Sequence, residues 1–105
     1  MDGSLWSTNM KFEVTLSPDA EEDLNYFTAF EQRIIMSAIK EYLSVDAHVE
    51  TKRRKPLQAN PIAPWELRRG QYRIFYDIIE NRVDVLAIGH KEHKDLFIKG
   101  RRVEL

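Results

Sequence analysis

Residues 65–91, WELRRGQYRIFYDIIENRVDVLAIGHK, are the stretch that decides the fold. Gly70 and Gln71 in this stretch are expected to form a two-residue turn, since glycine readily takes the positive φ of a tight hairpin. Asn81 tolerates the left-handed conformation at the next turn. Between the two turns, apolar side chains recur at every second position, the period of a strand with one buried face: Tyr72, Ile74, Tyr76 and Ile78. The stretch therefore predicts three consecutive strands in an antiparallel meander.

Length and composition limit the class of protein. A chain of 105 residues is large enough to bury a hydrophobic core as one domain. It contains no cysteine, so we expect neither a disulfide nor a thiolate metal site. No apolar run has the length of a membrane helix, and residues 1–10 lack the pattern of a signal peptide. We expect a cytoplasmic protein with a flexible N-terminal extension over residues 1–10 and a single domain over residues 11–105.

The charges are divided between the two halves of the chain. Residues 1–50 hold ten acidic and three basic residues, a net charge of −7, whereas residues 51–105 hold seven acidic and thirteen basic residues, a net charge of +6. This division indicates a basic surface that attracts nucleic acid or an acidic partner. The alternative is an evenly solvated surface whose charges are merely ordered unevenly along the sequence.

Helix signals precede the meander. Residues 11–16 alternate between polar and apolar side chains, which predicts a strand with one apolar face. Ser17 and Pro18 then form a helix start, with a capping hydroxyl before a proline at the first helical position. Thr28 and Glu31 match a capping box, so a second helix begins there and continues to Leu43. We expect the two helices to form a hairpin that covers one face of the sheet, and residues 91–97 to form a short terminal helix.

Alternation along the meander assigns its side chains to two faces of the sheet. Trp65 and Leu67 belong to the face that the helices are expected to cover. The other face is expected to be open and carries these side chains: Glu66, Arg68, Arg73, Phe75 and Asp77. Arg73 is the main candidate on the open face, because a guanidinium can hold a phosphate with two parallel hydrogen bonds. The alternative is an Arg73 that pairs with Asp77 or Glu66 across the sheet.

Further candidates flank the meander. His90 and Lys91 end its last strand and are expected to project toward the same surface, where a histidine can transfer a proton and a lysine can stabilise an oxyanion. A run of four cations lies before the sheet: Lys52, Arg53, Arg54 and Lys55. It is expected to join Arg68, Arg69 and Arg73 of the meander in one basic patch that binds nucleic-acid phosphates. Such runs are more often solvated loops, which is the alternative for this one.

Two segments of the meander carry a resemblance to a known family. LRRGQYRIFY at residues 67–76 and IGHK at residues 88–91 resemble the signature of the RelE/ParE toxins of bacterial type II toxin–antitoxin systems. AEEDL at residues 20–24, the helical residues 34–43 and KPL at residues 55–57 agree with it, so the resemblance covers roughly residues 11–97. It implies a RelE-like α+β fold in the order β-α-α-β-β-β-α. In this fold a two-helix hairpin packs on a mainly antiparallel four-stranded sheet, which is followed by a short C-terminal helix.

The resemblance also implies a function. RelE-like toxins cleave mRNA on the ribosome by attack of the substrate's own 2′-hydroxyl, which needs neither a metal nor another cofactor. The implied partners are a cognate antitoxin, the ribosome and mRNA. The ParE branch of the same family is associated with DNA gyrase instead, so a gyrase inhibitor is the alternative. A further alternative is a catalytically degenerate toxin that acts as a binding module.

Catalytic roles carry over from the resemblance only where residues match. Arg73 matches the family arginine that contacts the reacting phosphate, and Lys91 stands where catalytic members have a second arginine. Pro64 and Glu66 stand in place of lysines, and Phe97 stands in place of a tyrosine. Phe97 can stack on a base but cannot transfer a proton. If the chain cleaves RNA, the resemblance therefore leaves proton transfer to Glu66 or to His90.

Overall fold

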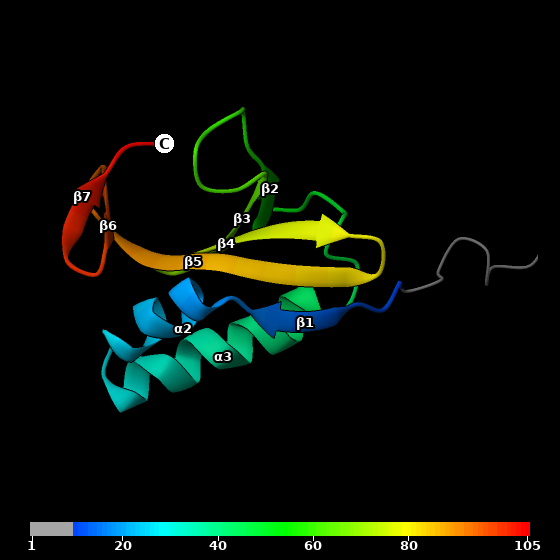
Figure 1. The fold of residues 1–105 in the computed structure, drawn as a ribbon, viewed down its shortest axis with the longest axis horizontal. Coiled ribbons are helices and arrows are strands. Elements are labelled where there is room, and N and C mark those ends of the chain that lie inside the picture. The colour runs from blue at the N-terminus through cyan, green and yellow to red at the C-terminus, as the bar shows by residue number, and fades with distance from the viewer. Residues whose placement is uncertain (1–9) are drawn as a thin grey trace, which may run out of the picture.

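The computed structural model describes residues 10–105, so the predicted extension lies outside the described residues except for Met10. The elements in chain order are β1 (Glu13–Leu16), α2 (Pro18–Asn25), α3 (Ala29–Leu43), β2 (Arg54–Pro56), β3 (Trp65–Arg69), β4 (Tyr72–Ile79), β5 (Arg82–Glu92), β6 (Asp95–Ile98) and β7 (Arg101–Val103). The strands form one curved sheet with both helices on one side of it (Figure 1). This arrangement confirms the predicted α+β class.

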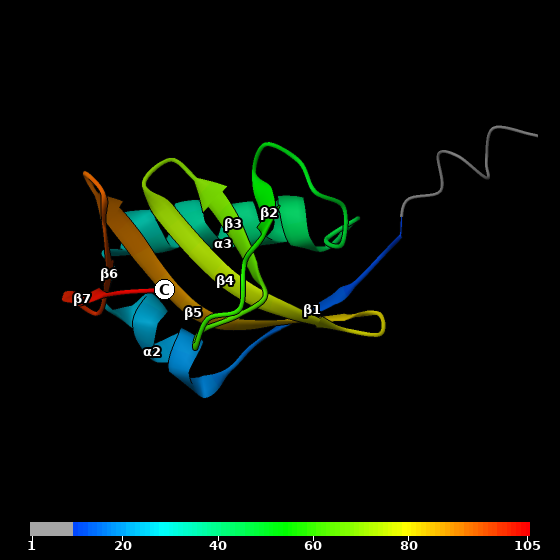
Figure 2. The ribbon, with the colours of Figure 1, turned by 90° about the horizontal axis from the view of Figure 1, so that it is seen from above.

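The antiparallel meander is present as predicted. β3, β4 and β5 pair in sequence order, and they run side by side across α3 (Figure 2). Gly70 occupies the first turn with a φ of +59°. In the second turn the left-handed residue is Glu80, with a φ of 57°, and not Asn81 as predicted. The reason is positional, because a two-residue hairpin turn places a positive φ at its first residue.

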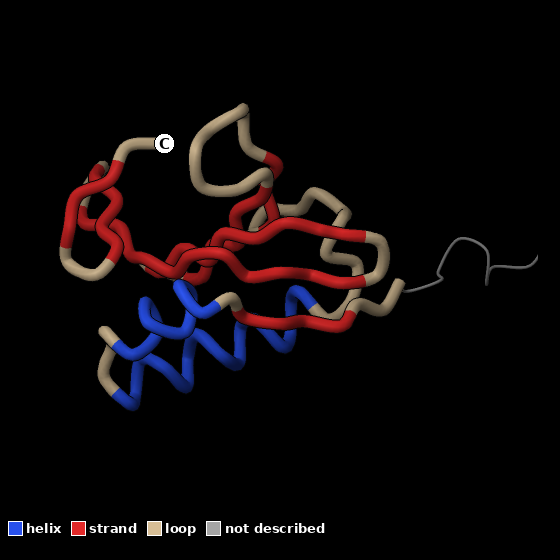
Figure 3. Tube along the Cα trace, viewed as in Figure 1, coloured by secondary structure: helices blue, strands red, loops and turns tan. Residues whose placement is uncertain are grey.

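Both helix starts form as predicted. The Ser17 hydroxyl accepts a hydrogen bond from the Ala20 N–H at 3.0 Å, and Thr28 and Glu31 form a reciprocal capping box. One stripe of α3 is buried against the apolar side chains of the sheet: Ile35, Ala38, Ile39 and Leu43. Both helices lie below the meander strands in this view, with β1 beside them (Figure 3). Neither helix of residues 10–105 is long and apolar enough to cross a membrane.

The predicted terminal helix over residues 91–97 is wrong. β5 continues to Glu92, His93 turns the chain with a φ of 57°, and β6 and β7 follow as a hairpin. The reason is burial at every second position, because Leu96 is buried and Ile98 is partly buried against the sheet face opposite the helices. With β2, β6 and β7 included, the described residues form a seven-stranded sheet and not the predicted four-stranded one. It is mainly antiparallel, and β1 alone runs parallel to β5.

One edge of β5 has two neighbouring strands with a gap between them. β1 pairs with residues 82–85 of β5, and β6 pairs with residues 90–92. Helix α2 fills the gap through the Asp23 carboxylate, which accepts a hydrogen bond from the Ile88 N–H at 3.0 Å. The Lys99 ammonium from the β6–β7 turn lies 3.6 Å from the same carboxylate. Asp23 is 2% exposed, and burial raises its carboxyl pKa despite the Ile88 hydrogen bond and the Lys99 charge.

The β6–β7 hairpin folds over the sheet at Gly89. A Cβ at Gly89 would run into the Phe97 carbonyl oxygen and lie 2.9 Å from Ile98 Cγ1, so only glycine fits there. A second apolar cluster forms under this hairpin and the loop before β3; its buried members are Ala63, Phe75, Ala87 and Leu96. Phe75 is fully buried, so the expectation that its face of the sheet is open is wrong in the middle of that face.

The Asp23 contact predicts a stability effect. Asp23→Ala leaves the buried Ile88 N–H without its acceptor, which costs about 1–3 kcal/mol. The matched control is Glu41→Ala, an exposed acid on α3 whose replacement changes stability by less than about 0.5 kcal/mol. Urea unfolding of the three proteins measures both values. Equal stability of the two variants would show that α2 is held by other contacts.

The raised pKa of Asp23 predicts a pH dependence. A carboxyl whose pKa is higher in the folded state contributes its stability at acid pH and loses it as the pH rises through the folded pKa. The unfolding free energy of the wild type relative to Asp23→Asn is therefore expected to fall as the pH is raised from about 4 toward neutrality. Urea unfolding across this range measures the difference. A difference that grows with pH would contradict the raised pKa.

The close approach at Gly89 predicts a local structural effect. Gly89→Ala forces β6 away from β5 and is expected to cost about 1–3 kcal/mol, as overpacking of a core does. Gly70→Ala is the control, because a Cβ at Gly70 meets no atom within 4 Å and only the positive φ is strained. Amide chemical shifts of β6 and β7 should change in the first variant and not in the second. Unchanged amide chemical shifts in Gly89→Ala would mean that the β6–β7 hairpin does not pack closely against position 89.

Candidate functional site

Arg68 and Arg73 lie directly opposite each other on β3 and β4. Their neighbours Leu67 and Ile74 point into the core between the sheet and the helices, so the two arginines lie on the other side of the sheet, which we call the arginine face. Side chains opposite each other in an antiparallel pair have Cβ atoms about 5 Å apart. The predicted assignment of Trp65 and Leu67 to the helix-covered side is confirmed.

The Arg73 guanidinium is held by the backbone of its own hairpin. Its Nη1 donates to the Gly70 carbonyl at 2.8 Å and to the Tyr72 carbonyl at 2.9 Å. Burial lowers the pKa of Arg73, the Glu66 charge opposes this effect, and the Arg68 charge adds to it. Among residues 10–105 Arg73 forms no ion pair with Asp77 or Glu66, so the alternative of a paired Arg73 is not what the structure shows.

Glu66 is the ion-pair partner of Arg68. Its Oε2 lies 2.5 Å from the Arg68 Nε, and its side chain is 3% exposed. By register it stands between Lys55 on β2 and Phe75 on β4. The carboxylate that was a candidate for proton transfer is therefore buried and already accepts a charge-assisted hydrogen bond.

His90 lies on the helix side of the sheet, so the expectation that it shares a surface with Arg73 is wrong. Its ring stacks on Phe97 at 5.6 Å between centroids, and its Nε2 lies 3.2 Å from Glu92 Oε2. The register explains this placement, because Arg73 pairs with Gly89 and His90 pairs with Tyr72, one position further along. A bulge at Leu86 shifts the alternation of side chains along β5 by one residue. Val85 and Ile88 therefore both face the helices, and so does His90, two residues after Ile88.

Lys91 falls on the same side of the sheet as Arg73. Its backbone N–H donates to the Gln71 carbonyl at 2.8 Å, so it lies beside the hairpin turn that carries Arg73. Its ammonium lies 3.5 Å from the Lys94 carbonyl. The side chains of these two neighbouring candidates therefore point to opposite sides of the sheet, with Lys91 on the arginine face and His90 on the helix side.

The run of four cations divides between different surroundings. Arg54 donates to the Tyr42 and Val49 carbonyls at 2.9 Å each and so binds the end of α3 and the loop behind it. Arg53 lies over the Tyr42 ring, 5.1 Å from its centroid. Lys55 alone aligns with the arginine face, beside Glu66, while Lys52 is exposed. Arg69 is exposed and pairs with Tyr72, whose side chain faces the helices. The expectation of one continuous basic patch is therefore wrong.

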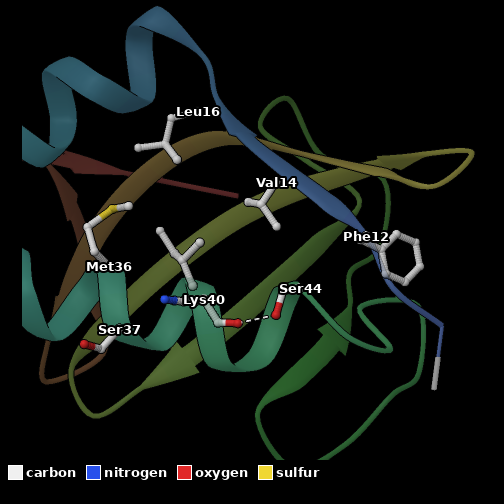
Figure 4. Close-up of a pocket in the computed structure, with 8 residues that line it drawn as sticks. Phe12, Val14, Leu16, Met36, Ser37, Lys40 and Ser44 are labelled. Atoms are coloured by element: carbon white, nitrogen blue, oxygen red, sulfur yellow. Dashed lines mark hydrogen bonds between the residues drawn. The ribbon is translucent and has the colours of Figure 1, made fainter.

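An apolar groove lies on the opposite side of the molecule, between β1 and α3. Val14 and Leu16 of β1 and Met36 of α3 point into it, with the Lys40 side chain at its edge (Figure 4). Its volume is about 450 Å³. The groove has no connection with the arginines, because the whole sheet separates them.

Comparisons with known proteins agree with this fold. A family model described as the ParE toxin of the type II toxin–antitoxin system parDE matches residues 14–94. One similar solved structure is the toxin–antitoxin complex RelBE2 from Mycobacterium tuberculosis, with a TM-score of 0.65 and 23% identity. This similarity covers 77% of the present chain and 99% of that chain. No curated protein sequence matches. Since the family model spans most of the domain, the chain belongs to the ParE toxin family of type II toxin–antitoxin systems, within the RelE/ParE superfamily.

Proposed function

We propose that this toxin is a ribosome-dependent mRNA endonuclease that stops translation. The observation that supports the proposal most strongly is the fixed Arg73 guanidinium on the arginine face. Two backbone carbonyls hold one nitrogen of this group, which leaves its other N–H groups for a ligand. A fixed and partly buried guanidinium stabilises charge on a phosphate better than a mobile one, because little reorganisation is needed.

The proposed reaction needs little covalent chemistry from the protein. The substrate 2′-oxygen forms a bond to the adjacent phosphorus while the bond from phosphorus to the 5′-oxygen breaks. The 2′-hydroxyl loses a proton and the departing 5′-oxygen gains one, so the products are a 2′,3′-cyclic phosphate and a 5′-hydroxyl. The phosphate gains one negative charge on the way, and Arg73 stabilises this charge. Lys91, on the same face, is proposed to stabilise the departing oxygen.

Proton transfer is the step that the protein supports least. Glu66 is engaged with Arg68, and His90 lies across the sheet from Arg73. We therefore assign the protein the work of orienting the RNA and stabilising charge, with water or ribosomal groups exchanging the protons. Phe97 pairs with His90 and stacks on its ring, so it lies on the helix side of the sheet, and no contact of Phe97 with RNA beside Arg73 is proposed.

The proposed partner is an antitoxin that covers the apolar groove between β1 and α3. The similar solved structure is itself a toxin–antitoxin complex. The groove carries an apolar wall from both elements and the Lys40 ammonium, which suits an apolar segment with a carboxylate nearby. Such a segment orders on binding and adds to the sheet or packs as a helix.

A DNA gyrase inhibitor is the second candidate function. The specific observation in its favour is that neither proposed proton-transfer side chain is free beside Arg73, since Glu66 is paired and His90 faces the helices. A toxin that acts by binding alone does not need such a group. The family model is also that of a ParE toxin, whose name does not specify RNA cleavage.

The proposed function predicts the effect of removing Arg73. Induction of the chain in growing bacteria is expected to stop growth and to create new mRNA 5′ ends inside translated reading frames. Arg73→Ala should lower the cleavage rate by about 10²–10³, the usual loss when one charge-stabilising group is removed. Arg69→Ala is the control, because Arg69 is an exposed arginine near the same turn with the opposite orientation on its strand.

The alternative outcomes separate the candidate functions. Growth arrest with intact mRNA, broken DNA and an induced repair response would replace the nuclease with the gyrase inhibitor. Arrest that survives Arg73→Ala, with cleavage unchanged, would remove the arginine face from the mechanism. No arrest would identify a binding module.

A further inference from the structure

Arg68 and Arg73 place two positive charges at opposite positions of β3 and β4, and the Glu66 carboxylate that pairs with Arg68 also acts on Arg73 through its charge. Like charges directly opposite in an antiparallel pair destabilise a sheet. Within residues 10–105, the Arg68 guanidinium hydrogen-bonds Glu66 alone, and the Arg73 guanidinium hydrogen-bonds the Gly70 and Tyr72 carbonyls alone. The remaining N–H groups of both side chains are therefore available to one shared ligand.

Both guanidinium groups are fixed in place. Arg68 is bound through its Nε, so the outer edge with its two Nη atoms is free. Arg73 is bound through Nη1, so its Nε and Nη2 are free. Fixing a long side chain in advance removes much of the entropy cost of binding. The pair thus has the properties of a preorganised anion site. Arg69 is exposed like Arg68, but unlike Arg68 its side chain has no hydrogen-bond partner within residues 10–105.

Glu66 is the buried residue that holds Arg68 in place. A carboxylate that is 3% exposed is costly unless it is paired, and its ion pair is Arg68. The residues paired with Glu66 on the two adjacent strands are Lys55 and the fully buried Phe75, so the position of the Glu66 carboxylate is constrained by the sheet. Its role follows from the contact, since it orients the Arg68 guanidinium and leaves the outer edge of that group for the ligand.

We propose that Arg68 and Arg73 bind a single phosphate group between them, and that Glu66 is the positioning residue for Arg68. The proposal deepens the proposed function and rests on it for the identity of the ligand, an RNA backbone phosphate. Two free guanidinium edges match the several oxygens of a phosphate, whereas a carboxylate has only two oxygens. Arg68, Arg73 and Glu66 together carry one net positive charge, which favours an anionic ligand.

The test uses inorganic phosphate as the probe and the full chain as the protein. In a titration near pH 7.5, the Nε–H signals of Arg68 and Arg73 are followed by NMR at constant ionic strength with chloride. Both signals are expected to follow one saturation curve with one Kd. Arg68→Ala and Arg73→Ala should each raise this Kd at least tenfold, and the double variant should add little more. Arg69→Ala should change it less than twofold.

Further variants separate a specific site from surface charge. Arg68→Lys keeps the charge and loses the planar fork, so it should not restore binding. Glu66→Gln keeps the volume and should raise the Kd several-fold, because Arg68 is no longer fixed. Separate curves for the two arginines, or an Arg69→Ala effect as large as that of Arg68→Ala, would overturn the shared site. Amide spectra of each variant verify the fold, and the arginine variants decide the question if Glu66→Gln does not fold.

The outcomes also separate this inference from the proposed function. A shared phosphate site together with intact mRNA in induced cells would support the phosphate site and reject the nuclease function. Cleavage of mRNA with no shared site would retain the nuclease and remove the role assigned to Arg68 and Glu66.

Discussion

The hydrogen bond from the Ile88 N–H to the Asp23 carboxylate is the contact on which the arrangement depends. It closes the gap that β1 and β6 leave along β5, and it fixes α2 against the sheet. The Lys99 ammonium from the β6–β7 turn approaches the same carboxylate, so one buried group joins the helix layer, the central strand and the terminal hairpin. Such a carboxylate is costly to bury, and its raised pKa reflects that cost.

The sheet that this contact completes separates two surfaces of different chemistry. The arginine face carries Arg68, Arg73 and Lys91 in a strip beside the buried Phe75. The helix side carries the apolar groove and the His90 ring with Glu92 beside it. The division of charge along the sequence has a structural counterpart, because both helices come from the acidic half and the meander comes from the basic half. Under the proposed function, these two surfaces are separate places for a phosphate target and for an antitoxin.

The sequence was sufficient for the parts of the fold that local rules control. Alternation in β4, the turn at Gly70 and both helix caps follow from periodicity and side-chain capping, and all of them were predicted. The β6–β7 hairpin was not predicted, because residues 91–97 become strand only when Leu96 is buried against Phe75 and Ala87. The Asp23 contact was also not predicted. From sequence alone an acidic residue in α2 is explained by the favourable charge at a helix start, and the stretch of β5 without a neighbouring strand is known only from the structure.

The candidate site was predicted less completely than the fold. Arg73 and Arg68 were assigned to the correct face by counting residues along β3 and β4. His90 was assigned to the wrong one, because the bulge at Leu86 shifts the alternation by one residue and nothing in the local sequence marks it. Glu66 was placed on the correct face, but its burial between Lys55 and Phe75 and its ion pair with Arg68 do not follow from counting residues along one strand.

We propose that the arginine face receives the reacting phosphate, with His90 turned away from it on the helix side of the sheet. The most direct measurement is a cryo-electron microscopy structure of the protein on a ribosome with an mRNA whose reactive 2′-hydroxyl carries a methyl group. We expect an arrangement in which the phosphate of that nucleotide lies between the guanidinium groups of Arg68 and Arg73, with His90 out of contact with RNA. A phosphate bound beside His90, or an arginine face turned toward solvent, would contradict it.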